Sequence, residues 1–132
     1  MPDSDFPQKI QVLVVDSDPD SRDLLAALFN GYEARTIMAA SASECLEKIQ
    51  ESPPDLLVCE LALPDEDGYS LMGKVKAFEA AQGIRIPAIT LTVYASDEDR
   101  SLALAAGFSR HLSKPLDIDE FLEAVTYALA QP

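Results

Sequence analysis

Short apolar runs alternate with longer amphipathic runs along the chain. Two of the short runs, residues 12–15 and 56–59, are apolar without a break, which is typical of strands covered on both faces. Further strands are expected at residues 36–40, 88–92 and 110–113. Five predicted strands that alternate with five amphipathic segments favour a parallel sheet with helices on both of its faces.

The amphipathic segments carry helix start and stop signals. We expect helices that begin near Pro19, Ser41, Tyr69, Ser96 and Asp117. Each has a capping residue, a proline or a glycine at an end, or apolar residues at helical spacing. In the first helix the residues at this spacing, expected to be buried together, are Leu24, Leu25, Leu28 and Phe29.

The two most apolar strands should lie at the centre of the sheet. In the strand order 2-1-3-4-5 of a flavodoxin-like (βα)5 fold, they are neighbours, and ligand chemistry is expected just beyond their carboxyl ends. The side chains expected at this edge are Asp16, Ser17, Glu60, Thr92 and Lys114. Two carboxylates, two hydroxyls and one amine are therefore predicted to meet there.

Size and charge narrow the function classes. A chain of 132 residues suits one domain, and we expect a polar lead-in at residues 1–9 and a single domain at residues 10–131. Ten basic against 23 acidic residues give a formal charge of −13, and the basic residues are scattered along the chain. Direct binding to nucleic acid or to an anionic membrane surface is therefore not expected.

Cysteine usage and the N-terminus favour the cytoplasm. Cys45 and Cys59 are too few for a disulfide framework and lack metal-ligand spacing, so we expect two small buried hydrophobes in a reducing compartment. The sequence MPDSDFPQ has acidic residues where a signal peptide has basic ones, and no apolar run is long enough to span a bilayer.

Several motifs together resemble the receiver domains of bacterial two-component response regulators. They are VLVVDSDPDSRDLL, LALPDEDGYSLM, IPAITLT, AAGF and SKPL, and the resemblance covers residues 10–130. The stretch at residues 85–116 is especially similar to receivers attached to sensor histidine kinases. The resemblance implies signalling with a sensor histidine kinase, a histidine phosphotransfer protein or another signalling protein as partner.

The resemblance also implies roles for particular residues. In this family an Asp after strand three accepts a phosphoryl group from phosphohistidine, and two acids after strand one help that Asp to hold Mg²⁺. Asp16 matches the first acid, the backbone carbonyl of Ala62 matches a metal ligand, and Thr92 and Lys114 match the residues that contact the phosphoryl oxygens. Metal and amine would neutralise the charge that develops during transfer.

Two positions depart from the family pattern. Aligned on Pro64 and Gly68, the phosphoacceptor position holds Glu60, and Ser17 replaces the second metal-binding acid. The extra methylene moves the carboxylate outward by about 1.5 Å, and a misplacement of about 1 Å can slow a reaction roughly a hundredfold. Ser17 offers only a neutral oxygen, which is a weak ligand for Mg²⁺.

We therefore expect weak or absent Mg²⁺ binding, impaired or absent phosphorylation, and a protein that acts by protein–protein contact. It is not expected to be an enzyme beyond weak self-phosphorylation and self-dephosphorylation. Glu60 either imitates part of the phosphorylated state by contacting Thr92 and Lys114, or is a structural ion-pair partner. Asp65 and Asp67, further along the loop, are interpreted as turn formers and solvated charges.

Two other functions remain open. One is a working Mg²⁺-dependent phosphoacceptor, in which Asp16 and Glu60 still bind the metal. The other is a flavodoxin-like cofactor binder, although the acidic loop DSDPDS lacks the hydroxyl- and glycine-rich cradle that a phosphate group needs. A yellow sample would indicate a bound flavin.

Smaller signals concern the last third of the chain. His111 stands at the position of an aromatic switch residue that responds to the Thr92 position, or is a half-exposed ring without that role. Tyr94 is expected to pack on the following helix. The Lys114–Pro115 bond is cis in the family, although trans is the default for a single X–Pro bond.

The face at residues 96–130 is the expected surface for partners or a homodimer.

Overall fold

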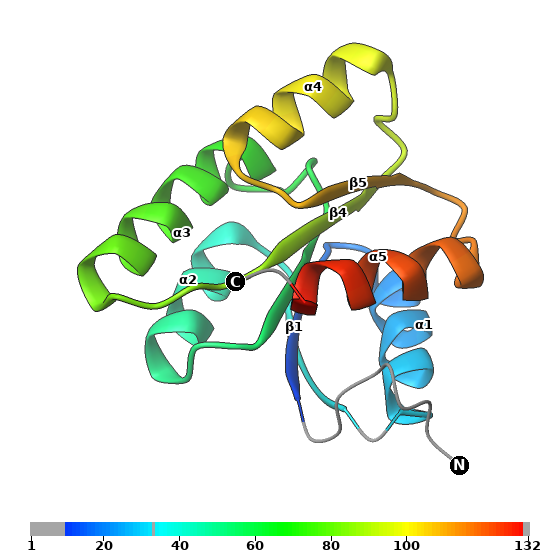
Figure 1. The fold of residues 1–132 in the computed structure, drawn as a ribbon, viewed down its shortest axis with the longest axis horizontal. Coiled ribbons are helices and arrows are strands. Elements are labelled where there is room, and N and C mark those ends of the chain that lie inside the picture. Colours follow the sequence, from blue (N-terminus) through cyan, green and yellow to red (C-terminus); the bar gives the residue numbers. More distant parts are fainter. Residues whose placement is uncertain (1–9, 33, 131–132) are drawn as a thin grey trace.

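The computed structural model describes residues 10–32 and 34–130, which form five strands and five helices in alternation (Figure 1). The elements are β1 (Gln11–Val15), α1 (Pro19–Asn30), β2 (Arg35–Ala39), α2 (Ala42–Glu51), β3 (Leu56–Cys59), α3 (Gly68–Gln82), β4 (Ala88–Thr92), α4 (Asp97–Ala106), β5 (Arg110–Ser113) and α5 (Ile118–Ala130). All strand pairs are parallel, in the order β2-β1-β3-β4-β5. The predicted α/β fold and strand order are confirmed. The predicted lead-in lies outside the described residues, and the boundaries of the domain stay a prediction.

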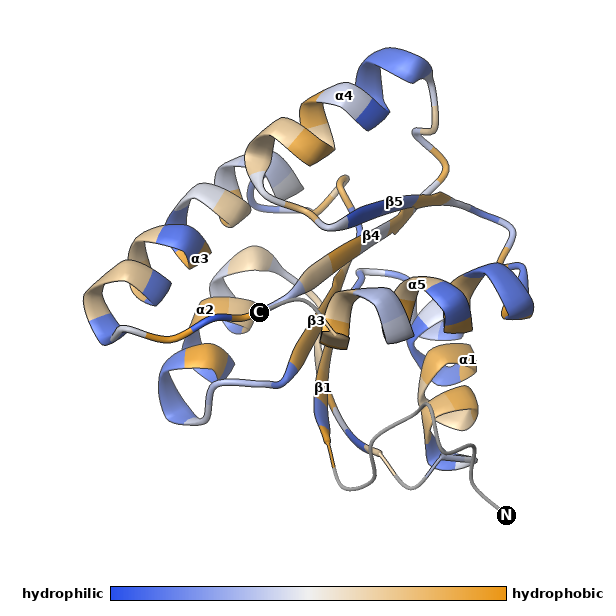
Figure 2. Ribbon diagram, viewed as in Figure 1, coloured by the Kyte–Doolittle hydropathy of each residue, from blue (hydrophilic) through white to orange (hydrophobic). Residues whose placement is uncertain are grey.

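Alternating side chains of the strands face two separate apolar layers. Val12 and Val14 of β1 belong to the layer under α1 and α5, whereas Leu13 and Val15 face the layer under α2, α3 and α4. Figure 1 shows these helices on the two sides of the sheet, and Figure 2 shows the apolar colouring of most of β3 and β4 between them. Burial on both faces explains why β1 and β3 appear in the sequence as the unbroken apolar runs at residues 12–15 and 56–59.

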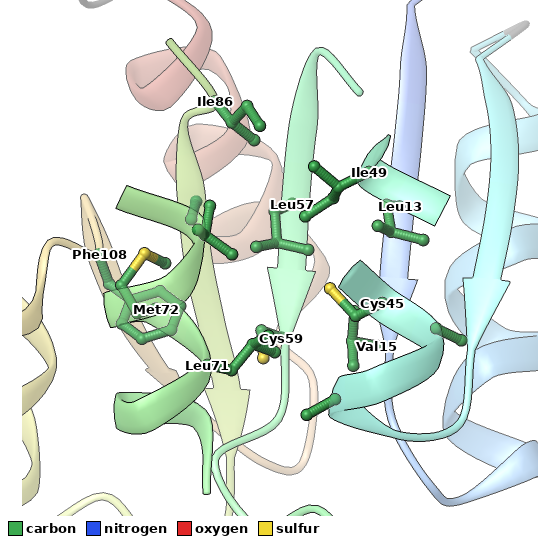
Figure 3. Close-up of a cluster of buried hydrophobic side chains, with 14 of the residues drawn as sticks. Leu13, Val15, Cys45, Ile49, Leu57, Cys59, Leu71, Met72, Ile86 and Phe108 are labelled. Carbon is green, nitrogen blue, oxygen red and sulfur yellow. The ribbon is translucent and has the colours of Figure 1, made fainter. Parts of the chain in front are cut away.

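The layer under α2 and α3 contains both cysteines (Figure 3). Cys45 of α2 and Cys59 of β3 are fully buried and free, as expected. Burial raises the pKa of the Cys45 thiol to about 12 and raises the pKa of Cys59 well above its usual value. Both side chains therefore stay protonated and pack as hydrophobes.

The opposite layer joins the first and last helices. The rings of Phe29 in α1 and Phe121 in α5 meet edge to face, with centroids 5.6 Å apart and planes at 67°. Leu25 is buried beside them, but Leu24 is 52% exposed, so its predicted place on the buried face is wrong. Adjacent residues of a helix differ by about 100° in direction, and Leu25 rather than Leu24 faces the sheet.

Helix caps hold the loops at the carboxyl edge of the sheet. Asp18 and Ser96 are the N-caps of α1 and α4, and their side chains accept hydrogen bonds from the first turns of these helices. Gly107 closes α4 with φ +117°, a conformation that L side chains rarely adopt.

None of the helices in residues 10–32 and 34–130 is long and apolar enough to cross a membrane.

Asp65 and Asp67 are exposed, as expected, but each also caps a helix. Asp67 is the N-cap of α3, and its side chain accepts a hydrogen bond from the backbone N–H of Ser70. Asp65 accepts from the backbone N–H groups of Ala42 and Ser43, at 2.9 and 2.8 Å, and so ties the β3–α3 loop to the start of α2. These two hydrogen bonds lower the pKa of Asp65. The interpretation of both residues as merely solvated turn formers was therefore incomplete.

Candidate functional site

Four of the predicted site residues meet at the carboxyl edge of the sheet. Val15 of β1 is in register with Cys59 of β3, so Asp16 and Glu60, the next residues, are neighbours. Thr92 ends β4, and Lys114 follows β5 directly. The sheet register alone thus brings two carboxylates, a hydroxyl and an amine together, as the sequence predicted.

Lys114 joins the two carboxylates. Its Nζ lies 2.9 Å from Asp16 Oδ2 and 3.0 Å from Glu60 Oε1. Both carboxylate residues are buried, with 3% of Asp16 and 7% of Glu60 exposed. Burial by itself would lower the pKa of Lys114, but the hydrogen bonds and charges of Asp16 and Glu60 outweigh it, and the pKa is raised. Lys114 is therefore held in its charged form.

The second oxygen of Glu60 is bound by the chain that follows it. Glu60 Oε2 accepts hydrogen bonds from the backbone N–H groups of Leu61 and Ala62, at 2.7 and 3.3 Å. The side chain therefore turns into the site and not into solvent. Gly68 allows this loop to close, because a Cβ there would lie 3.0 Å from the Glu60 carbonyl oxygen and from Leu61 Cα.

Asp16 is also fixed from two sides. Its Oδ1 accepts a hydrogen bond from the backbone N–H of Asp18 at 2.9 Å, which starts the turn into α1. Arg22 Nη1 donates to the main-chain carbonyl oxygen of Asp16 at 2.6 Å. Sequence reasoning missed Arg22, whose spacing six residues after Asp16 and one helical turn into α1 could have suggested this contact.

The remaining predicted metal ligands lie at the rim of the site. Ser17 and Ala62 are both exposed. Among the described residues, no group of three or more His, Cys, Asp or Glu side chains is arranged to hold a metal ion. The ammonium of Lys114 is the cationic group between the Asp16 and Glu60 carboxylates.

Thr92 is buried but belongs to a separate hydrogen-bond network. A contact between Thr92 and Glu60, which belonged to one of the two alternatives for Glu60, is not among the hydrogen bonds of the described residues. Thr92 Oγ1 accepts instead from the backbone N–H of Tyr94 at 3.1 Å. His111 Nε2 lies 2.9 Å from the Tyr94 carbonyl oxygen, and Nδ1 lies 2.7 Å from Thr90 Oγ1. Because a carbonyl can only accept, Nε2 carries a proton and donates.

The ring of His111 is buried, with 5% of the residue exposed, so the expectation of a half-exposed ring is wrong. Its partner Thr90 was not predicted, although the two residues are register partners in β4 and β5. Tyr94 is 52% exposed and packs less than expected. The Lys114–Pro115 bond is cis, the form that the resemblance implied.

Residues 12–126 match the family model for the response regulator receiver domain. The chain belongs to this family. It is a receiver domain of a two-component response regulator, and receiver domains are generally signalling modules rather than catalysts. The resemblance inferred from the motifs is confirmed.

Similar proteins include short and long chains. The chain is 42% identical to an uncharacterized 14.6 kDa protein in the sodA1 3′ region of Leptolyngbya boryana, and the match covers 94% of both. It is 34% identical to the transcriptional regulatory protein ZraR of Salmonella typhimurium over 92% of this chain but only 27% of ZraR. The chain thus spans about a quarter of that regulator.

Solved receiver structures have the same fold. A putative response regulator from Chloroflexus aurantiacus is 28% identical with a TM-score of 0.85, and the match covers 94% of this chain and 100% of that one. A CheY-like response regulator receiver domain protein from Methanospirillum hungatei is 28% identical with a TM-score of 0.81, covering 93% and 94%.

Proposed function

We propose that this receiver domain signals by contact with other proteins and that Glu60 takes the place of a phosphorylated side chain. Phosphoryl acceptance is then impaired or absent. One observation carries the proposal: Glu60 already accepts hydrogen bonds from the Lys114 ammonium and from the N–H groups of Leu61 and Ala62. These are donors that the oxygens of a phosphoryl group at this position would need.

An incoming phosphoryl group would have to displace these bonds. Each hydrogen bond contributes about 0.5–1.5 kcal/mol net, and those to charged groups about 1.5–3 kcal/mol. In-line transfer also needs an oxygen aimed at the phosphorus, whereas the hydrogen bonds to Oε1 and Oε2 fix the orientation of the Glu60 carboxylate. The longer side chain therefore opposes transfer by its contacts as well as by its position.

The residues do not suit a Mg²⁺ site of the kind that receiver domains typically use for phosphorylation. Mg²⁺ needs near-octahedral oxygen ligands at about 2.0–2.1 Å. Here the Lys114 ammonium lies within hydrogen-bond distance of both carboxylates, and the second acid position holds the neutral, exposed Ser17. Asp16 instead positions Lys114, so its role is electrostatic.

Glu60 reproduces only part of a phosphorylated site. It contacts Lys114 and the loop N–H groups, but it carries one negative charge where a phosphoryl group carries about 1.5 to 2. Thr92 remains bound to the N–H of Tyr94. The sequence therefore fixes the conformation of the domain in the absence of phosphorylation. Binding of a partner protein, and not transfer of a phosphoryl group, would shift this conformation.

We expect the partner to be a sensor histidine kinase, a histidine phosphotransfer protein or another signalling protein in the cytoplasm, and we expect no enzymatic activity. The face at residues 96–130 is the proposed surface for a homodimer. Leu102 and Leu104 of α4 and Tyr127 of α5 are 41–50% exposed there, which supports contact with another protein. Sedimentation equilibrium of the wild type and of Leu102→Asp tests the homodimer.

Phosphoryl acceptance is tested by intact mass after incubation with Mg²⁺ and acetyl phosphate. The wild type should gain no phosphoryl mass, whereas Glu60→Asp combined with Ser17→Asp should gain one, and EDTA should prevent it. Glu47→Asp combined with Ser101→Asp makes the same chemical changes at exposed positions on α2 and α4 and should gain none. Uptake by the wild type would refute the proposal, as would a double variant that folds but stays unmodified.

A further inference from the structure

A hollow lies between the β3–α3 loop, the β4–α4 loop and the start of α4. It has a volume of about 240 Å³ and is lined by Leu61, Ala62, Asp67, Tyr69, Tyr94 and Asp99. The lining combines apolar side chains and two aromatic residues with two carboxylates, and it contains no basic residue. In Figure 2 the first turn of α4 has hydrophilic colouring, while part of the connection from β4 to α4 has hydrophobic colouring.

The aromatic residues give the hollow an exposed apolar wall. Tyr94 is 52% exposed and its neighbour Val93 is 66% exposed, which is a large apolar area for a loop in an otherwise acidic protein. Tyr69 is held in place, because its hydroxyl donates to the main-chain oxygen of Asp99 at 3.3 Å. Exposed tyrosines of this kind supply much of the binding energy in protein interfaces.

The two carboxylates retain capacity for a cationic ligand. Asp67 Oδ1 accepts from the N–H of Ser70, and in Asp99 Oδ2 accepts from the Ser96 hydroxyl while Oδ1 accepts from the Tyr69 hydroxyl at 3.5 Å. These bonds orient the carboxylates without neutralising them. A carboxylate has about four acceptor sites, so both side chains can accept further hydrogen bonds. Two more acids, Asp97 and Glu98, stand in the same first turn of α4 and add to the negative potential.

We propose that this hollow binds an arginine side chain of a partner protein. A guanidinium is flat, stacks on aromatic faces and presents five donors to carboxylates, while its aliphatic stem suits the surface formed by Leu61 and Ala62. Lysine fits less well, because its ammonium is compact and strongly hydrated. The net charge of −13 would also draw a basic partner toward this surface.

The position of the hollow links it to the Glu60 site. The N–H groups of Leu61 and Ala62 hold Glu60, and the backbone of Tyr94 binds both Thr92 and His111. A bound arginine would therefore touch both loops that border the site. The inference goes beyond the proposed function, since it requires neither the presence nor the absence of phosphorylation.

The test is a titration of ¹⁵N-labelled wild-type protein, without acetyl phosphate, using N-acetyl-Gly-Arg-Gly amide at fixed low ionic strength. We expect saturable shifts of the amide signals of Leu61, Ala62 and Tyr94. The citrulline peptide, which has the same shape without the charge, should bind about tenfold more weakly, and the lysine peptide should also bind more weakly.

Variants separate the hollow from general attraction to an acidic surface. Asp99→Asn should weaken binding about fivefold, and Tyr94→Ala should weaken it by a similar factor. Asp23→Asn on α1 and Tyr127→Ala on α5 are the matched controls at exposed positions elsewhere, and they should leave binding unchanged. Equal binding of the lysine or citrulline peptide, shifts spread over the whole surface, or equal losses in the controls would each overturn the proposal.

Discussion

His111 Nε2 lies 2.9 Å from the main-chain carbonyl oxygen of Tyr94, so a side chain of β5 holds the loop that follows β4. Nδ1 of the same ring lies 2.7 Å from the hydroxyl oxygen of Thr90, which is fully buried. Tyr94 in turn gives its N–H to the hydroxyl of Thr92. His111 therefore holds the same residue, Tyr94, whose N–H occupies the Thr92 hydroxyl.

His111→Phe keeps a ring of similar size and removes both of its hydrogen bonds. We expect the free energy of unfolding to fall by about 1–3 kcal/mol in urea, because polar partners are left unpaired in the interior. Hydrogen exchange at the Tyr94 N–H should become faster. Adding Thr90→Val should restore part of the loss, and a His111→Phe variant as stable as the wild type would contradict the role of this contact.

Glu60→Gln retains the size of the side chain and removes its charge. We expect the free energy of unfolding to fall by about 1.5–3 kcal/mol, the usual value of a hydrogen bond to a charged group. The pKa of Lys114, followed by NMR of its side chain, should fall, since only Asp16 then stabilises the ammonium. An unchanged Lys114 titration would mean that Glu60 does not contact it in solution.

The raised pKa of Lys114 predicts a loss of stability in alkali. The side chain of an unfolded lysine has a pKa of about 10.4. The Lys114 contribution is fully present below that pH and is lost as the pH rises through the higher folded value. Urea unfolding at a series of pH values should therefore show wild type and Lys114→Met converging in alkali.

Lys74→Met is the matched control for this titration. Lys74 forms an exposed ion pair with Glu66, which contributes about 0–1 kcal/mol at most. The difference between this variant and the wild type should be small at every pH. If Lys114→Met differed from the wild type by the same amount at all pH values, the ionic contact would not be its cause.

Gly107→Ala should destabilise the domain by at least about 1 kcal/mol, because φ there is +117°. A Cβ would also meet the end of the Lys76 side chain. Gly73→Ala is the control: it lies inside α3 with open space around its Cβ position and should stabilise the protein by about 0.5–1 kcal/mol. Thermal unfolding of both variants gives the comparison.

The strands and their order follow from the sequence because local signals and burial agree. The run at residues 56–59 is β3, residue for residue, and the run at 88–92 is β4. Apolar residues on both faces and nearby proline leave few other structures for these segments. The starts of α1, α2 and α4 also follow from the sequence, because Asp and Ser favour the N-cap position that Asp18, Ser41 and Ser96 occupy.

The composition of the site was predictable, but its bonding was not. Strand register placed Asp16, Glu60 and Lys114 together, because parallel strands end at one edge. The partner of the Thr92 hydroxyl depends on the path of the loop after β4, and the cap that Asp65 gives to α2 joins residues more than 20 apart. No local pattern encodes such contacts, because they depend on tertiary packing.

The Lys114–Asp16 contact spans 98 positions of the chain, and the Lys114–Glu60 contact spans 54. Pairing of β1 with β3 alone would bring two like charges together in a nonpolar setting, which disfavours that intermediate. Only when β5 docks does the ammonium arrive between them. The edge strand β5 of the described sheet thus leads directly to the residue that supplies the counter-charge, so the two buried carboxylates are compensated only when the sheet is complete.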